Sequence, residues 1–158
     1  MKRSHTILVM SLASLEQTVQ TLQALPRDAQ ITNLIKLAGD LKQLAPDSSQ
    51  TWDVKDVRQD LECADTVGLY VRRSPTGVRL AAEVGQEVTT LTKALTALMV
   101  QHLDGETPTA IASVTANQLS KIVPESLLRQ RQNTVNYAVQ RLQDAVRALE
   151  PVGIAERI

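Results

Sequence analysis

The segment 68–80, GLYVRRSPTGVRL, is the only stretch of this chain whose pattern clearly predicts a β-hairpin. Apolar and polar residues alternate on both sides of residues 74–77, Ser-Pro-Thr-Gly, which are typical of a turn. Alternation places every second side chain on the same face of a sheet, so one face of the hairpin should point to the core. We expect Leu69 and Val71 to pair with Val78 and Leu80 on the core face, with Tyr70, Arg72 and Arg79 on the outer face.

Nearly all of the remaining sequence has helical spacing. A chain of 158 residues can bury one sizeable core or two small ones. It has no Phe, one Trp and two Tyr, so the core must consist of Leu, Val, Ile and Ala, which favours packed helices. Apolar residues at steps of three and four predict helices over about residues 8–25, 28–41, 53–64 and 84–103, a shorter helix that opens at Thr107-Pro108, and a long last helix that opens at Pro124.

Two of these helices carry heptad-like apolar seams, which are suited to packing along a partner helix. The seams predict a homodimer formed through the helices Val84–Leu103 and Val135–Leu149. Their residues are Val84, Val88, Leu91, Leu95, Leu98 and His102 in the first, and Val135, Ala138, Leu142, Ala145 and Leu149 in the second.

The predicted helix and hairpin over residues 53–85 resemble the end of a winged helix-turn-helix domain. The resemblance lies in VRQDLE, GLYVRR, the loop SPTG and VRLAAEVG, which follow the order helix, Gly-Leu step, paired arginines and returning wing. It implies a helix in the major groove and a wing that reaches the DNA backbone or the minor groove. The contacts that it implies are Lys55, Arg58 and Gln59 on the helix, and Arg72, Arg73 and Arg79 on the wing.

The last long helix carries residue types that read bases in DNA. Arg can bond guanine bidentately, and Asn and Gln can do the same to adenine. Gln132 and Asn136, four residues apart, should share a face. An alternative that stays open is a solvated amphipathic helix. The predicted DNA contacts here are Arg129, Arg131, Gln132, Asn133, Asn136 and Arg141.

We therefore expect a mostly α protein, winged helix-turn-helix-like, with one short β-hairpin and long amphipathic helices. Residues 1–83 would form a winged-helix-like domain, and residues 84–158 a linking or dimerisation helix followed by a possible second winged-helix-like unit. A weak similarity between the two halves suggests a tandem arrangement, including a second strand pair near the C-terminus. Chance similarity between Leu-rich helices is the alternative.

The function predicted from these features is a small, dimeric, cytoplasmic DNA-binding transcriptional regulator that contacts duplex DNA with a wing and a helix. The alternative is a helical or tandem winged-helix protein-interaction subunit, an adaptor in a larger assembly without DNA readout. A formal net charge of zero and the acidic residues of segment 53–62 favour this alternative.

Residues for catalysis or metal binding are sparse in the sequence. Cys63 is the only cysteine, which excludes an intramolecular disulfide and fits a reducing cytoplasm. Its place in a predicted helix favours an inert buried thiol. His5 and His102 are the only histidines, and no glycine-rich phosphate loop is present. We predict no enzyme activity, no catalytic or metal-binding residue, no cofactor and no membrane span.

Overall fold

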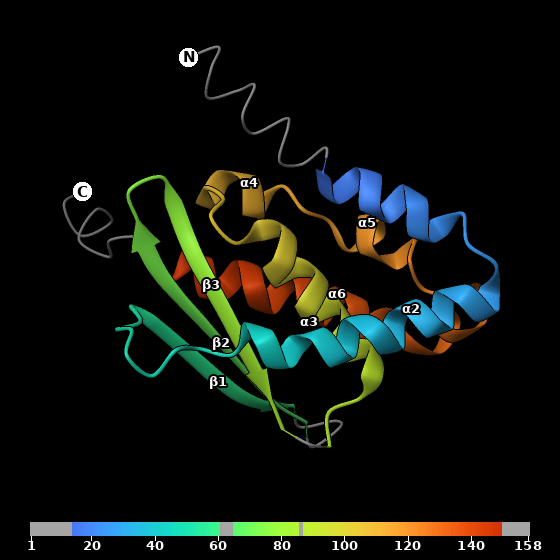
Figure 1. The fold of residues 1–158 in the computed structure, drawn as a ribbon, viewed down its shortest axis with the longest axis horizontal. Helices are drawn as coiled ribbons and strands as arrows, with labels where there is room; N and C mark the ends of the chain where they lie inside the picture. Colours follow the sequence, from blue (N-terminus) through green and yellow to red (C-terminus); the bar gives the residue numbers. More distant parts are fainter. Residues whose placement is uncertain (1–13, 61–64, 86, 150–158) are drawn as a thin grey trace, which may run out of the picture.

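The structure is a computed structural model that describes residues 14–60, 65–85 and 87–149. A helix at residues 14–23 comes first. The elements that follow are α2 (Arg27–Asp40), the 3-10 helix η1 (Leu41–Leu44), β1 (Val54–Asp60), β2 (Asp65–Ser74), β3 (Gly77–Val84), α3 (Thr90–Leu103), α4 (Pro108–Ala112), α5 (Ala116–Ser120) and α6 (Glu125–Arg147) (Figure 1).

A three-stranded antiparallel sheet in the order β1-β2-β3 packs against helices (Figure 1). α3 contacts β3, and α6 contacts both β1 and β2, so these two helices lie against the inner face of the sheet. α2 packs on α3. The core lies between the sheet and these helices, and its large, fully buried side chains are aliphatic, as the scarcity of aromatic residues predicted.

The predicted hairpin is confirmed as the strand pair β2–β3. Val71 pairs with Leu80 and Arg72 with Arg79, and the turn closes where Ser74 pairs with Gly77. The observed register sets Leu69 opposite Ala82 and Val78 opposite Arg73, so among the four expected residues only Val71 and Leu80 pair with each other. The predicted core-facing residues are indeed buried: Leu69, Val71, Val78 and Leu80.

Residue 77 must be glycine because the backbone that follows α3 passes close to it. A Cβ atom at this position would lie 2.4 Å from the carbonyl oxygen of Glu106. The Val78 N–H donates to that carbonyl at 2.9 Å, and the Gly105 N–H donates to the Val78 carbonyl at 2.7 Å. The segment after α3 therefore covers the start of the β3 edge, and no larger side chain fits at residue 77.

The helix predicted over residues 53–64 is wrong, because residues 54–60 form the strand β1. Antiparallel pairing with β2 sets Val54, Asp56 and Arg58 on the inner face, opposite Val71, Leu69 and Val67. Val57 lies on the other face and is 53% exposed. Two of the inward residues are charged, so the period-two pattern was hidden, and the spacing of Val54 and Val57 suggested a helix instead.

Elsewhere in the described chain, helices form where the apolar spacing predicts them, with one difference. The helix predicted over residues 84–103 begins only at Thr90, and Val84 is instead the last residue of β3. α4 opens at Pro108, and the Thr107 side chain accepts a hydrogen bond from the Ala110 N–H as its N-cap. α6 begins directly after Pro124. Within the first predicted helix, residues 14–23 are helical and residues 8–13 lie outside the described residues.

The two heptad-like seams pack inside the molecule, so the predicted dimer through these helices is wrong. Leu91, Leu95 and Leu98 of α3 are buried, as are Val135 and Leu142 of α6. All five belong to one hydrophobic core cluster of this chain. An amphipathic helix in a globular core presents the same spacing as a helix in a dimer seam.

The fold class is mixed α and β, and the prediction of a mostly α, winged helix-turn-helix-like protein is wrong. The residues taken for a recognition helix form the strand β1, so the described element that directly precedes the hairpin is not a helix that could enter a groove. Within the described part of residues 107–149 the regular elements are α4, α5 and α6, without a strand pair. The strand pair predicted near the C-terminus lies outside the described residues.

The division of the chain at residue 83 stays a prediction; that position falls within β3. Among the helices of the described ranges, none is both long and apolar enough to cross a membrane.

Candidate functional site

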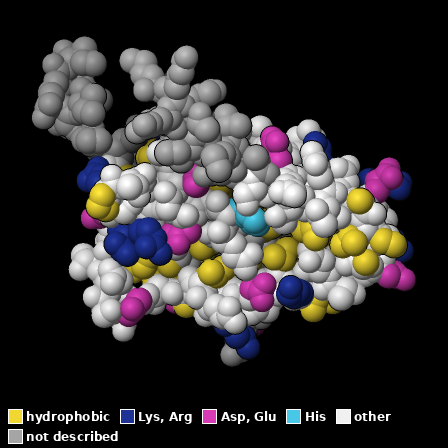
Figure 2. Space-filling view, turned by 45° about the horizontal axis from the view of Figure 1, so that its top comes forward, with side chains coloured by type: hydrophobic (Ala, Val, Ile, Leu, Met, Phe, Trp, Pro, Cys, Tyr) yellow, Lys and Arg dark blue, Asp and Glu magenta, His cyan; other side chains and the backbone are white. Residues whose placement is uncertain are grey.

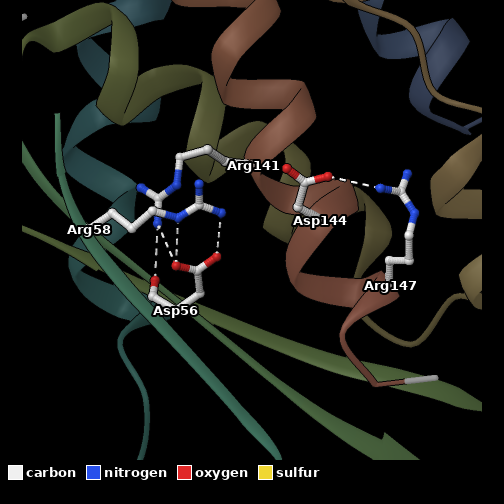
Figure 3. Close-up of polar contacts among 5 residues, drawn as sticks. All are labelled: Asp56, Arg58, Arg141, Asp144 and Arg147. Carbon is white, nitrogen blue, oxygen red and sulfur yellow. Dashed lines mark hydrogen bonds and ion pairs between the residues drawn. The ribbon is translucent and has the colours of Figure 1, made fainter. Parts of the chain in front are cut away.

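An ionic cluster lies on the inner face of the sheet, where β1 meets α6 (Figure 3). Arg58 and Asp56, two residues apart on β1, form a bidentate pair: Arg58 Nε donates to Asp56 Oδ1 at 2.8 Å, and Nη2 to Oδ2 at 2.7 Å. Arg141 reaches the same residue from α6. Its Nη2 donates to the Asp56 carbonyl oxygen at 3.0 Å and lies 3.4 Å from Oδ1.

The two arginines of this cluster differ in solvent exposure. The Arg58 side chain is 41% exposed, whereas that of Arg141 is 4% exposed. The hydrogen bonds from Arg58 and the positive charge of Arg141 hold the pKa of Asp56 below its usual value, against the opposing effect of burial. Burial lowers the pKa of Arg141, and the nearby charge of Arg58 adds to this effect. One carboxylate therefore serves two cations.

A cavity of about 30 Å³ lies beside this cluster. It is lined by residues of β2, α3 and α6, is partly open to solvent, and has Arg141 as part of its wall. Most of its surface is apolar, and its lining residues on α3 and α6 include threonines and a tyrosine. The other lining residues are Val67, Leu69, Thr92, Thr96, Met99, Thr134, Tyr137 and Ala138.

The single cysteine falls in the connection between β1 and β2. β1 ends at Asp60 and β2 begins at Asp65, and these two residues pair with each other. Cys63 is therefore the second residue before β2 in the sequence. The prediction that its thiol is buried and inert concerns a residue outside the described ranges.

The residues predicted to bind DNA from the first half of the chain lie on strands. Lys55, Arg58 and Gln59 belong to β1, Arg72 and Arg73 to β2, and Arg79 to β3. The register sets Arg72 and Arg79 side by side.

Three of these arginines are held by contacts within the molecule. Arg79 forms a bidentate pair with Asp104, Nε to Oδ1 at 3.0 Å and Nη2 to Oδ2 at 3.1 Å. Arg73 Nη2 donates to the Leu149 carbonyl oxygen, and Arg72 Cζ lies 5.6 Å from the centroid of the Trp52 ring.

The predicted DNA contacts on the last helix do not share a face. Arg129 lies 4.0 Å from Glu125, and Arg141 is buried against β1. Gln132 donates to Asn136 Oδ1 at 3.0 Å, so the prediction that these two share a face is confirmed. Arg131 interrupts the helical geometry at φ −126° and ψ 19°, and Asn133 is exposed.

The described surface does not gather these arginines into one basic patch. Arg58, Arg79 and Arg129 each have a carboxylate partner. On the face shown in Figure 2, basic side chains are scattered among acidic, polar and apolar ones. The electrostatic attraction on which duplex binding depends is therefore weak here.

The sequence analysis missed Asp56 as the residue that joins β1 to α6. The available signal was alternation through Val54, Asp56 and Arg58, which predicts a strand once charged residues are allowed on its inner face. Within the described ranges, no three His, Cys, Asp or Glu side chains are grouped so that they could hold a metal ion.

Comparison with solved structures supports the fold. The solution structure of a hypothetical protein from Thermus thermophilus is similar, with a TM-score of 0.65 and 23% sequence identity. The match covers 85% of this chain and 93% of that one. Comparison with curated proteins gives no match.

Comparison with protein families identifies the chain. The model of the SufE family, described as an Fe-S metabolism associated domain, matches residues 16–146. This match spans both halves of the chain, including the segment that resembled a winged helix-turn-helix. The predictions of a DNA-binding regulator and of duplex DNA as partner are therefore wrong, and the adaptor alternative is not supported either. The chain belongs to the SufE family.

Proposed function

We propose that this protein is a sulfur acceptor in Fe–S cluster metabolism and that the Cys63 thiol carries the sulfur. The observation that carries the proposal is the SufE family match over residues 16–146, which contains the only cysteine of the chain. Building an Fe–S cluster requires sulfur in a transferable form. A protein thiol can carry such sulfur as a persulfide, and this chain has one thiol.

The proposed step is a thiolate exchange that conserves every atom. The Cys63 thiolate attacks the terminal sulfur of a donor persulfide, R–S–SH. The sulfur–sulfur bond of the donor breaks, and its inner sulfur leaves as the thiolate R–S⁻. The product on this chain is Cys63–S–SH, and the terminal proton moves with the transferred sulfur. No external oxidant or reductant is needed.

The proposed donor is the persulfide of a cysteine desulfurase, a protein partner of the kind that the SufE family suggests. In this proposal the partner cleaves the carbon–sulfur bond of free cysteine, and this chain only accepts and carries the sulfur. Fe–S clusters are the downstream product rather than a resident cofactor. A reducing cytoplasm, which keeps thiols free, is the proposed location.

Intact mass spectrometry without reductant tests the proposal. The full-length protein is incubated with a cysteine desulfurase and L-cysteine. We expect a product heavier by one sulfur atom, which dithiothreitol removes. Cys63→Ser should show no such product, while the desulfurase alone should remain active in both reactions. A wild-type protein that stays at its original mass beside an active desulfurase contradicts the proposal.

A second donor separates thiol reactivity from partner recognition. A small-molecule persulfide, such as that of glutathione, should also load sulfur onto Cys63, but more slowly than the desulfurase. Equal rates from both donors would argue against a dedicated protein partner.

A further inference from the structure

The cavity between β2, α3 and α6 has a buried cation on its wall. Arg141 lines this cavity and is 4% exposed. Its Nε is buried and lacks a hydrogen-bond partner among residues 14–60, 65–85 and 87–149. Buried polar atoms are nearly always paired, and those of charged groups most of all. The Arg141 guanidinium therefore has capacity for a further acceptor.

The charges around Arg141 leave it incompletely neutralised. Its carboxylate partner, Asp56, forms the shorter, bidentate contacts with Arg58, at 2.8 and 2.7 Å, and only a 3.4 Å contact with Arg141. Asp144 on the same helix pairs instead with Arg147 at 2.9 Å (Figure 3). The cluster of two guanidiniums and one carboxylate thus carries one excess positive charge beside the cavity.

The size and the walls of the cavity restrict what could supply the missing charge. A volume of about 30 Å³ is more than one water requires and suits an ion of a few ångströms in diameter. Val67, Leu69 and Met99 make part of the wall apolar. Dehydrating a dianion such as sulfate costs far more than dehydrating a large monovalent ion, so the walls select against strongly hydrated anions. Thr134 and Tyr137, whose side chains carry hydroxyl groups, are also lining residues of the cavity.

We propose that this cavity binds one small, weakly hydrated monovalent anion, with Arg141 as its counter-charge. Hydrosulfide and the heavier halides share this chemistry. The proposal does not depend on sulfur transfer to Cys63, because binding is measured on protein that has met no sulfur donor. Either proposal can therefore fail without the other.

Methyl NMR of the full-length protein tests this site, because Met99 lines the cavity. Protein labelled with ¹³C at the methionine methyl groups is titrated with sodium bromide, sodium hydrosulfide or sodium sulfate at matched ionic strength, above neutral pH. Met99→Leu assigns the resonance. We expect bromide and hydrosulfide to shift the Met99 signal saturably and sulfate to leave it unchanged.

The titrations distinguish the two sources of the anion. Saturation by hydrosulfide alone supports the site and assigns it to sulfur species, and saturation by bromide alone supports it as a halide site. The proposal is overturned if neither bromide nor hydrosulfide saturates the shift of the Met99 signal, or if sulfate shifts that signal equally. Because these results come from the wild-type protein, they do not depend on whether a variant folds.

A pair of variants on α6 tests the role of the buried charge. Arg141→Met leaves Asp56 paired with Arg58, and we expect it to weaken the bromide Kd by at least about tenfold. Arg147→Met is the matched control, since Arg147 lies on the same helix, is 64% exposed in its side chain and does not line this cavity. It should leave the Kd unchanged. An unchanged Kd in a folded Arg141→Met protein overturns the assignment, and Thr134→Val offers a second variant of the cavity wall.

Discussion

The two faces of the sheet both carry arginine–aspartate pairs, but the pairs lie in different surroundings. On the inner face, Arg141 is 4% exposed and shares Asp56 with a second arginine. At the β3 edge, Arg79 is 48% exposed in its side chain and has Asp104 to itself, in bidentate geometry. The better-formed pair is thus the more exposed one.

The difference in burial determines how much each ion pair contributes to the stability of the fold. Exposed pairs are screened by water and contribute little to the free energy of unfolding. A buried cation depends strongly on its partner, because removal of the partner leaves a charge without solvent or counter-ion. Loss of the Asp56 carboxylate should therefore have the larger effect, although its 3.4 Å contact with Arg141 is longer than the contacts between Arg79 and Asp104.

The largest expected effect is the difference in the free energy of unfolding between the variants Asp56→Asn and Asp104→Asn. Asp56→Asn should lower the free energy of unfolding by about 2–3 kcal/mol, because it leaves Arg141 buried without a carboxylate. Asp104→Asn should cost about 1 kcal/mol or less, since its asparagine oxygen can still accept from the Leu80 N–H. Urea unfolding at neutral pH measures both. Equal losses of unfolding free energy in the two variants would show that the buried pair and the exposed pair do not differ in their contribution to stability.

A smaller effect is expected on the stability of the protein at acidic pH. The pKa of Asp56 in the folded protein is lower than its ordinary value of 3.8. Its contribution to stability is therefore fully present above that ordinary value and is lost as the pH falls through the lower folded value. Wild-type protein should lose more stability than Asp56→Asn when the pH falls below about 4. Unfolding midpoints measured down to pH 2 check this, and parallel curves for the two proteins would contradict it.

The smallest effect on stability is expected from the hydrogen bond between Tyr70 and Glu83 on the outer face of the sheet. The hydrogen bond from the Tyr70 hydroxyl to Glu83, with burial and the charge of Glu83, raises the pKa of Tyr70 to about 12. In a Tyr137→Phe background, Tyr70 is the only tyrosine, so absorbance of the phenolate reports it alone. Glu83→Gln should return its pKa toward 10.0 with less than about 1 kcal/mol lost in stability. A Tyr70 pKa that does not change in Glu83→Gln would show that Glu83 is not the cause.

The same contrast explains how much of the fold the sequence predicted. The β2–β3 hairpin was predictable because Leu69, Val71, Val78 and Leu80 are apolar on one face, which makes the period of two visible. β1 was not, because Asp56 and Arg58 occupy the inner face where apolar residues were expected. Their partner, Arg141, lies 85 residues away from Asp56 in the chain, and a local pattern cannot show such a contact.

The candidate site was even less accessible from the sequence. Arg141 reads as one of several polar residues on a helix, and only the packing of α6 on β1 shows that it is buried. Arg58, Arg72 and Arg79 suggested a cationic surface, but charge counts do not reveal which carboxylates stand beside them. Cys63 had no second cysteine or histidine nearby to mark it, and the family match rather than a motif gave it a role.

The most direct test of sulfur acceptance is to locate the transferred sulfur. After reaction with a cysteine desulfurase and alkylation, trypsin should release residues 59–72, the peptide that follows Arg58, ends at Arg72 and contains Cys63. We predict that this peptide carries one additional sulfur atom in most molecules and that no other peptide does. An unmodified peptide 59–72, recovered from a reaction in which the desulfurase itself is loaded with sulfur, would contradict sulfur transfer to this protein.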